Sequence, residues 1–289
     1  MATLSYETFV APAKPVVSAD LPAGEKREMF SPTTATLIHG DREAVLVDAL
    51  LTDSEGQALA DWVDESGKHL NTIYITHGHG DHFFGAAGLL ERFPDARLVA
   101  TPGVVDVMRK QAAEPWLDEY WRVAFPDQIG DPVVADPLDS DIIELEGMEL
   151  VVVPLGHSDT DNSTALHAPS IGLVTAGDSV YNGAHPYLSE AGADGLAEWF
   201  DALDTLDDLH PKTVVAGHKR PDAPDDPGSI EFTRRYLRDW EAADRGTDDA
   251  VQLYQTMLDR YPDLINRAML WHSAEAAKRS ASSGPPDRH

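Results

Sequence analysis

The amino-acid sequence predicts an α/β fold in which two β-sheets stack face to face and helices cover the outside. Short β-branched segments form two groups, between residues 34 and 101 and between residues 142 and 176, and helical patterns separate or follow them. We therefore expect one α/β domain over residues 1–225. A helical extension packed on it over residues 226–278 and a mobile polar tail over residues 279–289 would complete the chain.

Turn and stop signals delimit the first group of strands. Gly40 and Asp41 mark a hairpin-like turn, and Gly67 and Pro94 end the helices that follow. Pro115 breaks or kinks the third helix because proline has no backbone N–H to donate. The predicted strands are residues 34–38, 44–49, 71–76 and 97–101, and the predicted helices are residues 57–66, 84–93 and 104–125.

The second group of strands is followed by helices. Gly147 and the pair Pro169-Ser170 mark its turns. The predicted strands are residues 142–145, 149–154, 163–167 and 171–176, with a further strand at residues 213–216. Residues 196–206 and the amphipathic stretch 229–277 are predicted to be helical.

The charge balance argues against one class of partner. With 22 basic and 50 acidic side chains, the formal net charge is −28. Binding to nucleic acid relies on clustered Lys and Arg, so we expect a small-molecule substrate and no nucleic-acid partner. The chain has no cysteine, so any metal site must use His, Asp and Glu.

No targeting or membrane signal is visible. The first twenty residues lack a basic start followed by an apolar run. No stretch approaches the roughly 18–20 apolar residues that a membrane span needs. We expect a cytoplasmic protein with no membrane partner.

A dense cluster of metal-ligand residues follows the predicted strand at residues 71–76. His77, His79, Asp81 and His82 place three imidazoles and a carboxylate within six positions, separated by two glycines. Imidazole and carboxylate are standard ligands of Zn²⁺ and neighbouring divalent ions, and glycines permit the sharp backbone turns that aim such side chains at one point. The cluster predicts a metal site.

Three later residues could complete that site. His157, Asp178 and His218 each follow a predicted strand, and a glycine precedes each of them. Each alone could be an ordinary loop residue. Together with the first cluster they form a consistent set at successive strand ends.

This set resembles that of the metallo-β-lactamase superfamily, in which a His-x-His-x-Asp-His run is followed by a His, an Asp and a final His at the strand ends of a four-layer αββα sandwich. The resemblance covers residues 34–218 and matches all seven ligand positions. It implies that His77, His79 and His157 hold one metal and that Asp81, His82 and His218 hold the other, with Asp178 bridging them. Asp48 resembles the family's aspartate that orients a ligand histidine, although it could also be a simple strand-end turn residue.

The resemblance implies chemistry based on two divalent ions, of which Zn²⁺ is expected first. Two such ions about 3.5–4 Å apart share a water, lower its pKa and stabilise an oxyanion. The expected reaction is attack by the bridging hydroxide on an electrophilic centre. Asp81 would orient the nucleophile and carry a proton to the leaving group.

Departures from related branches favour a small ester or lactone as substrate. β-Lactamases of this superfamily tend to have Cys or Ser where Asp178 stands, and its diiron flavoproteins tend to have Glu at the position of His79. Its glyoxalase II-like thioesterases usually show His-Thr-Pro-Gly where this chain has His157-Ser-Asp-Thr. A phosphotriester or thioester is the alternative substrate, and an iron-dependent dioxygenase or an inactive binding protein of the same fold would be a different class. Lactonases and esterases remain the preferred type.

Aromatic residues near the cluster are candidates for the substrate pocket. Phe83 and Phe84 could line an apolar entrance or belong to the core, and the loop after Asp178 could present polar groups or lie against the surface. The loop candidates are Tyr181, His185 and Tyr187. Trp116, Tyr120 and Trp121 could form a lid, but their helical spacing favours ordinary packing or the contact of a homodimer.

Overall fold

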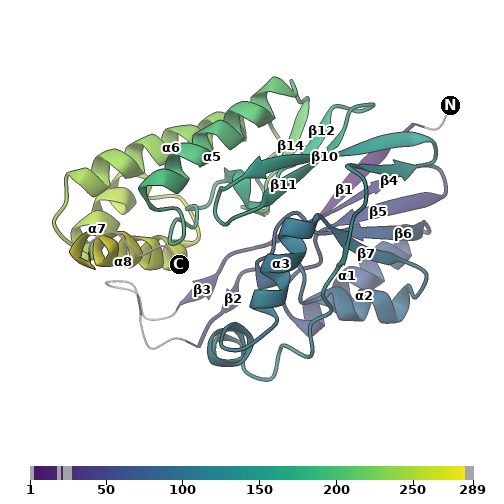
Figure 1. The fold of residues 1–289 in the computed structure, drawn as a ribbon, viewed down its shortest axis with the longest axis horizontal. Helices are drawn as coiled ribbons and strands as arrows, with labels where there is room; N and C mark the ends of the chain where they lie inside the picture. The colour runs from purple at the N-terminus through teal and green to yellow at the C-terminus, as the bar shows by residue number, and fades with distance from the viewer. Residues whose placement is uncertain (1–2, 18–20, 22–27, 284–289) are drawn as a thin grey trace.

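The chain folds into two β-sheets packed between layers of helices, as Figure 1 shows for this computed structural model. The structure describes residues 3–17, 21 and 28–283. The first sheet has the strand order β1-β4-β5-β6-β7-β8 and the second has the order β14-β12-β11-β10-β9. This arrangement confirms the predicted αββα sandwich with helices at its C-terminal end.

The first sheet mixes antiparallel and parallel pairing. β4 pairs antiparallel with β1 and β5, whereas β5, β6, β7 and β8 run parallel to one another. Its strands are β1 (Ser5–Val10), β4 (Thr34–His39), β5 (Glu43–Val47), β6 (His69–Tyr74), β7 (Arg97–Ala100) and β8 (Asp136–Pro137). The helices against its outer face are α1 (Asp53–Glu65), α2 (Ala86–Arg92) and α3 (Pro102–Gln111).

The second sheet is also mixed, with a parallel pair between β12 and β14. Its strands are β9 (Ile142–Leu145), β10 (Met148–Gly156), β11 (Ser163–Ala168), β12 (Leu173–Thr175) and β14 (Thr213–Val215). The helices on its outer side are α5 (Gly192–Asp208), α6 (Gly228–Arg245), α7 (Ala250–Arg260) and α8 (Arg267–Ser283). Two short pairs, β2 (Lys14–Pro15) with β3 (Met29–Phe30) and β13 (Tyr181–Asn182) with β15 (His218–Lys219), lie outside the two large sheets.

Three buried apolar clusters hold the layers together. The inter-sheet cluster contains Ile38, Tyr74 and Leu150, which are at most 1% exposed. A second cluster joins the first sheet to α1, α2 and α3, and a third joins the second sheet to α5 and to the C-terminal helices. Because α6, α7 and α8 share their core with α5, the C-terminal helices are part of one continuous packing unit.

Several predicted elements need correction. The predicted strand 171–176 is shorter, because Gly172 has φ +66° and closes a turn with Pro169 before β12 begins. The predicted break near Pro115 is confirmed, but the helix before it already ends at Gln111, and a separate π-helical segment (Trp116–Trp121) with a short α4 (Arg122–Ala124) follows Pro115. Helix α8 extends through residues 279–283 of the expected tail, and residues 284–289 lie outside the described residues.

Strands β1, β2, β3, β8, β13 and β15 were absent from the sequence-based prediction. Five of them have only two residues, and β1 pairs on one side only, with β4. Such elements are defined by their partners more than by their own pattern. In the described part of the chain, no helix is long and apolar enough to cross a membrane.

Candidate metal centre

The candidate metal ligands converge at one edge of the sandwich, where strands from both sheets end. His77 and its neighbours follow β6, Asp159 follows β10, Asp178 follows β12 and His218 begins β15. The glycines beside them make this approach possible. A Cβ at Gly217 would overlap Oδ1 of Asp178 and the backbone of Gly177.

The first group of ligand atoms comprises His77, His79 and Asp159, whose ligand atoms all lie within 4.8 Å of one another. Oδ2 of Asp159 lies 2.8 Å from Nδ1 of His79 and 3.5 Å from Nε2 of His77. All three side chains are buried. The group therefore offers two imidazole nitrogens and one carboxylate oxygen, a set that suits a divalent cation.

His157 lies outside this group, which differs from the ligand set predicted from the sequence. Its Nδ1 is 2.7 Å from Oδ1 of Asp161, and its Nε2 faces helix α5 at Gly195, where a Cβ would lie only 2.6 Å away. The loop after β10 thus turns the imidazole toward α5 and the carboxylate two residues later toward His77 and His79. Asp159, and not His157, is thus grouped with His77 and His79 in this structure, while Nε2 of His157 is buried without a hydrogen-bond partner among the described residues.

The second group comprises Asp81, His82 and His218, the three residues predicted for the second metal. Oδ2 of Asp81 lies 3.5 Å from Nε2 of His82 and 3.2 Å from Nε2 of His218. Asp178 contacts the same two histidines at 3.3 and 3.1 Å, and it also forms a ligand group with His77 and His82. Asp178 therefore lies between the two groups, where a bridging carboxylate would be placed.

Asp48 orients two of the histidines. Its Oδ2 is 2.9 Å from Nδ1 of His82, and both of its oxygens accept a hydrogen bond from the hydroxyl of Thr76. Because the Thr76 hydroxyl donates to Asp48, it accepts from Nδ1 of His77 at 3.0 Å. Nδ1 of both histidines therefore acts as the outward donor, and Nε2, the nitrogen available to a metal, faces the centre of the site. This placement agrees with the orienting role expected of Asp48.

The other two histidines are held in the same manner. Nδ1 of His218 lies 2.7 Å from the carbonyl oxygen of Pro32, which can only accept, so Nε2 faces Asp81 and Asp178. Nε2 of His79 lies 3.0 Å from Oε1 of Glu190, which leaves Nδ1 facing Asp159. Fixing the outer nitrogen of each imidazole is the usual way in which proteins orient metal-ligating histidines.

Several atoms at the centre have no hydrogen-bond partner among the described residues. They are Nε2 of His77, Nε2 of His82, Oδ2 of Asp159 and Oδ1 of Asp178, and all four are buried. Buried polar atoms without partners are costly, and their convergence on one point is explained by a cation that they would bind together. The residues present therefore fit two divalent ions.

The electrostatics of the cluster agree with a cation site. Burial disfavours the charged form of His82, but the carboxylates of Asp178, Asp81 and Asp48 outweigh it and hold the pKa of His82 well above its ordinary value. Burial likewise disfavours ionised Asp178, but His218 and His82 outweigh it and hold the pKa of that carboxyl well below its usual range. The carboxylates thus stay ionised, and the region attracts positive charge.

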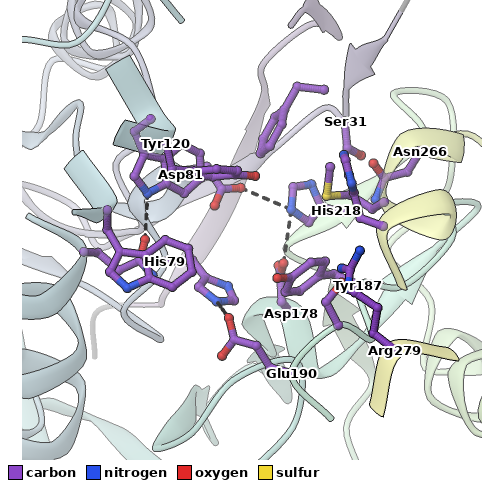
Figure 2. A pocket seen from close by; sticks show the side chains of 17 residues that line it. Ser31, His79, Asp81, Tyr120, Asp178, Tyr187, Glu190, His218, Asn266 and Arg279 are labelled. Atoms are coloured by element: carbon purple, nitrogen blue, oxygen red, sulfur yellow. Dashed lines mark hydrogen bonds and ion pairs between the residues drawn. The ribbon is translucent and has the colours of Figure 1, made fainter. Parts of the chain in front are cut away.

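A cavity of about 250 Å³ opens beside the cluster. Asp81, Asp178, His79 and His218 form one part of its wall, and Figure 2 shows Asp81 and Asp178 on either side of His218. The other lining residues are Phe30, Ser31, Gln111, Trp116, Tyr120, Trp121, Tyr187, Ser189, Glu190, Asn266, Met269, His272 and Arg279. The cavity is therefore acidic beside the ligand cluster and has a mixed aromatic and polar lining elsewhere.

The π-helical segment supplies much of that aromatic wall. Trp116, Tyr120 and Trp121 all line the cavity, although ordinary packing or a dimer contact was the favoured interpretation of the sequence. Trp121 is also part of the core, and its indole N–H donates to Oε1 of Gln111 at 2.7 Å. Trp116 is 42% exposed, which places it at the rim of the cavity.

The structure separates the other pocket candidates. Tyr187 lines the cavity, with its ring 5.7 Å from that of His79. Phe83 and Phe84 do not line it, because both belong to the core under the first sheet. Tyr181 is buried behind the site, where its hydroxyl donates to Oδ2 of Asp178 at 3.0 Å. His185 lies farther back, with Nδ1 2.8 Å from the hydroxyl oxygen of Tyr236.

The sequence left open whether the C-terminal helices cover the site, and it did not indicate Asp159 or Glu190. Asp159 could have been considered, since it lies two residues after His157 in the same loop. Nothing in the sequence pattern indicates that Glu190, 111 positions after His79, contacts that histidine. The same holds for Asn266 and Met269, which line the cavity from the other end of the chain.

The sequence is similar to those of known proteins over about half of the chain. The chain is 27% identical over 174 residues to hydroxyacylglutathione hydrolase from Trichodesmium erythraeum, an alignment covering 58% of each protein. It is 28% identical over 155 residues to a UPF0173 metal-dependent hydrolase from Pyrococcus horikoshii, covering 53% of this chain and 59% of that protein. The chain thus spans less than two thirds of the length of these relatives.

The fold has counterparts among solved structures. A metallo-beta-lactamase family protein from Thermus thermophilus superposes with a TM-score of 0.62 at 20% identity, covering 93% of this chain and 91% of that one. The sequence of residues 29–218 matches the family described as the metallo-beta-lactamase superfamily. This segment includes every residue of the two ligand groups. The chain therefore belongs to the metallo-beta-lactamase superfamily.

Proposed function

We propose that this protein hydrolyses a small ester or lactone with the help of two divalent metal ions, for which we propose Zn²⁺. The observation that carries the proposal is the pair of ligand groups joined by Asp178, with buried unpartnered atoms facing inward. His77, His79 and Asp159 would hold one ion, and Asp81, His82 and His218 would hold the other. Bound ions of this kind lower the pKa of a water and polarise a carbonyl oxygen.

The residues of the chain would prepare the reacting groups. Burial disfavours the ionised form of Asp81, but His82 and His218 outweigh it and hold the pKa of that carboxyl below its usual range. The hydroxyl of Thr33 donates to its Oδ2 at 3.3 Å. We assign to the Asp81 carboxylate the orientation of the attacking water and the delivery of its proton to the leaving oxygen.

The lining of the cavity supports an uncharged substrate. Asp81, Asp178 and Glu190 make its polar end acidic, and Arg279 is the only Lys or Arg among its described lining residues. A highly charged anion would meet repulsion there. An apolar ring or chain could pack against Trp116, Tyr120 and Trp121 while its carbonyl reaches the ligand cluster.

The test combines metal analysis with a substrate panel. Protein expressed with ample zinc should carry two ions per chain and should hydrolyse phenyl acetate or a γ- or δ-lactone with a higher kcat/KM than a phosphotriester. His79→Ala should abolish the activity while the circular dichroism spectrum stays unchanged. Fewer than one ion per chain, or the absence of ester and lactone hydrolysis by metal-loaded protein, would overturn the proposal.

A thioester is the second candidate substrate. Its support is the similarity to relatives named hydroxyacylglutathione hydrolase, which extends over 174 residues in the Trichodesmium protein. Thioesters and oxygen esters share an acyl carbonyl, so the same cluster could serve both. Comparing kcat/KM for an S-aryl and an O-aryl ester of the same acid distinguishes the two, and a higher value for the thioester would reverse our order.

A further inference from the structure

The C-terminal helix builds part of the cavity beside the metal-ligand cluster. Met269, His272 and Arg279 of α8 line it, as does Asn266, which directly precedes the helix. All four lie outside residues 29–218, the segment that matches the superfamily. This wall is therefore an addition to the shared core, and it is a place where substrate selection specific to this chain could arise.

Hydrogen bonds from two other parts of the chain hold α8 in place. The backbone N–H of Leu188 donates to Oγ of Ser273 at 2.8 Å, and Nε2 of His272 lies 2.7 Å from Oε1 of the buried Glu28. These contacts tie the helix to the loop after β13 and to the start of β3. The wall is thus a fixed surface of the cavity.

Asn266 is held especially firmly. The neighbouring Ile265 donates its N–H to the carbonyl of Gly183 at 3.1 Å and accepts from the N–H of His185 at 2.9 Å. Asn266 itself has φ +70°, a left-handed conformation that Asn adopts more readily than most residues. Its amide Nδ2 donates to the carbonyl oxygen of His185 at 2.9 Å.

The last bond fixes which way the amide faces. A carbonyl oxygen can only accept, so Nδ2 must face His185 and Oδ1 must face the other way. Asn266 is 6% exposed and lines the cavity, yet Oδ1 has no hydrogen-bond partner among the described residues. A buried acceptor of this kind strongly favours a ligand that brings a donor.

We propose that Oδ1 of Asn266 accepts a hydrogen bond from a hydroxyl or N–H group of the substrate. The preferred substrate is then an ester or lactone that carries such a donor on its acyl part, an inference that rests on the proposed hydrolase function. In Figure 2, Asn266 and His218 lie on the same side of the cavity, opposite Tyr120. A single small molecule in a cavity of about 250 Å³ can therefore reach both Asn266 and the ligand cluster.

Apart from this hydrogen bond, substrate selectivity would depend on how well the rest of the molecule fits the apolar part of the cavity. Met269 and Trp121 offer apolar contact to the rest of the molecule. A site built around a hydrogen bond rejects analogues that lack the donor much more strongly than it rejects those that differ by a methylene. The discrimination between matched substrates is therefore the quantity to measure.

The experiment uses two matched pairs of phenyl esters and metal-loaded protein. One pair is the hydroxyacetate and the methoxyacetate, and the other is the ester of N-acetylglycine and that of N-acetylsarcosine. With each rate divided by that of alkaline hydrolysis, the wild type should prefer the donor-bearing member of at least one pair by about tenfold or more in kcat/KM. The pair that shows the preference identifies the donor as hydroxyl or N–H.

Two variants separate recognition from folding. Asn266→Gly removes the acceptor and tolerates the left-handed backbone, and it should reduce the preference to less than threefold. Ser273→Ala loosens the docking of α8 without touching the cavity lining, and it should retain the preference, which is a ratio and does not depend on the folded fraction. Equal rates in the wild type, or an unchanged preference in Asn266→Gly, would overturn this inference alone. Failure of the metal-loaded protein to hydrolyse any phenyl ester or any lactone would overturn the proposed function as well.

Discussion

Oδ2 of Asp159 lies 2.8 Å from Nδ1 of His79, whereas His157 turns its imidazole toward Gly195 on α5. The loop after β10 thus contributes a carboxylate to the first ligand group. A carboxylate adds a negative charge where a third imidazole would be neutral, which favours a harder divalent cation and a higher total charge of bound metal.

The first prediction concerns the different positions of Asp159 and His157 relative to the first ligand group. Asp159→Asn removes the charge with little change in volume, and it should lower the metal content from two ions toward one and reduce kcat at least about 100-fold. His157→Ala should keep both ions and most of the activity. Metal content measured by atomic emission decides between them, and loss of metal in His157→Ala with retention in Asp159→Asn would restore the ligand set expected from the sequence.

The sequence predicted most of this site because its signals are local. His77, His79, Asp81 and His82 lie within six positions after one strand, so their proximity needs no knowledge of the fold. The choice between His157 and Asp159 depends on the path of one loop and on the space left at Gly195. That information belongs to the packing of α5 against the second sheet, and no sequence period carries it.

The fold likewise was predictable where the sequence signals are local and not where an element depends on long-range contacts. The hairpin of β4 and β5 was predicted because its strands alternate with clear turn signals, and the register Thr36 with Val47 shows it in the structure. β3 has two residues and is defined by its pairing with β2 and its contact with α8. Long-range contacts of this kind also bring Asn266 to the cavity wall.

A second prediction concerns the orienting role of Asp48. Asp48 has φ +63°, a conformation that Asn also tolerates, so Asp48→Asn should fold. The variant loses the charged acceptor for Nδ1 of His82 and should bind metal about 10–100-fold more weakly. Affinity is measured by competition with a chromophoric chelator.

Glu146→Gln is the matched control for Asp48→Asn. The Glu146 carboxylate accepts hydrogen bonds from the backbone N–H groups of Asp41, Arg42 and Glu43, in a turn remote from the ligand cluster. It should leave metal affinity unchanged. Equal effects of the two substitutions would show that Asp48 acts through general stability only.

A third prediction follows from the protonation of the second ligand group. Burial disfavours charged His218, but Asp178 and Asp81 outweigh it and raise the pKa of His218 to about 10. A metal binds neutral imidazole, so below this pH binding must release a proton, and the apparent affinity should rise with pH by up to about tenfold per unit for each proton displaced. Calorimetric titration of zinc into chelator-treated protein at pH 7.5, in two buffers of different ionisation enthalpy, should show release of at least one proton. A proton count of zero would contradict the protonated state of the metal-free cluster.

The last prediction concerns the aromatic wall of the cavity. Trp116 lines the cavity at its rim and stands 5.8 Å from Tyr120, ring to ring, in an edge-to-face arrangement. Because Trp116 is 42% exposed, Trp116→Ala should cost little stability. It should raise KM for phenyl esters about tenfold and leave kcat within about twofold, since it removes binding that is the same in the ground state and the transition state.

The control variant is Val123→Ala, at a residue that is 57% exposed on the following helix and outside the cavity lining. It should leave both KM and kcat unchanged. Methyl esters of the same acids should respond equally to both variants, because they lack the ring that Trp116 would contact. A fall in kcat with unchanged KM for the phenyl esters would instead place Trp116 in contact with the reacting carbonyl.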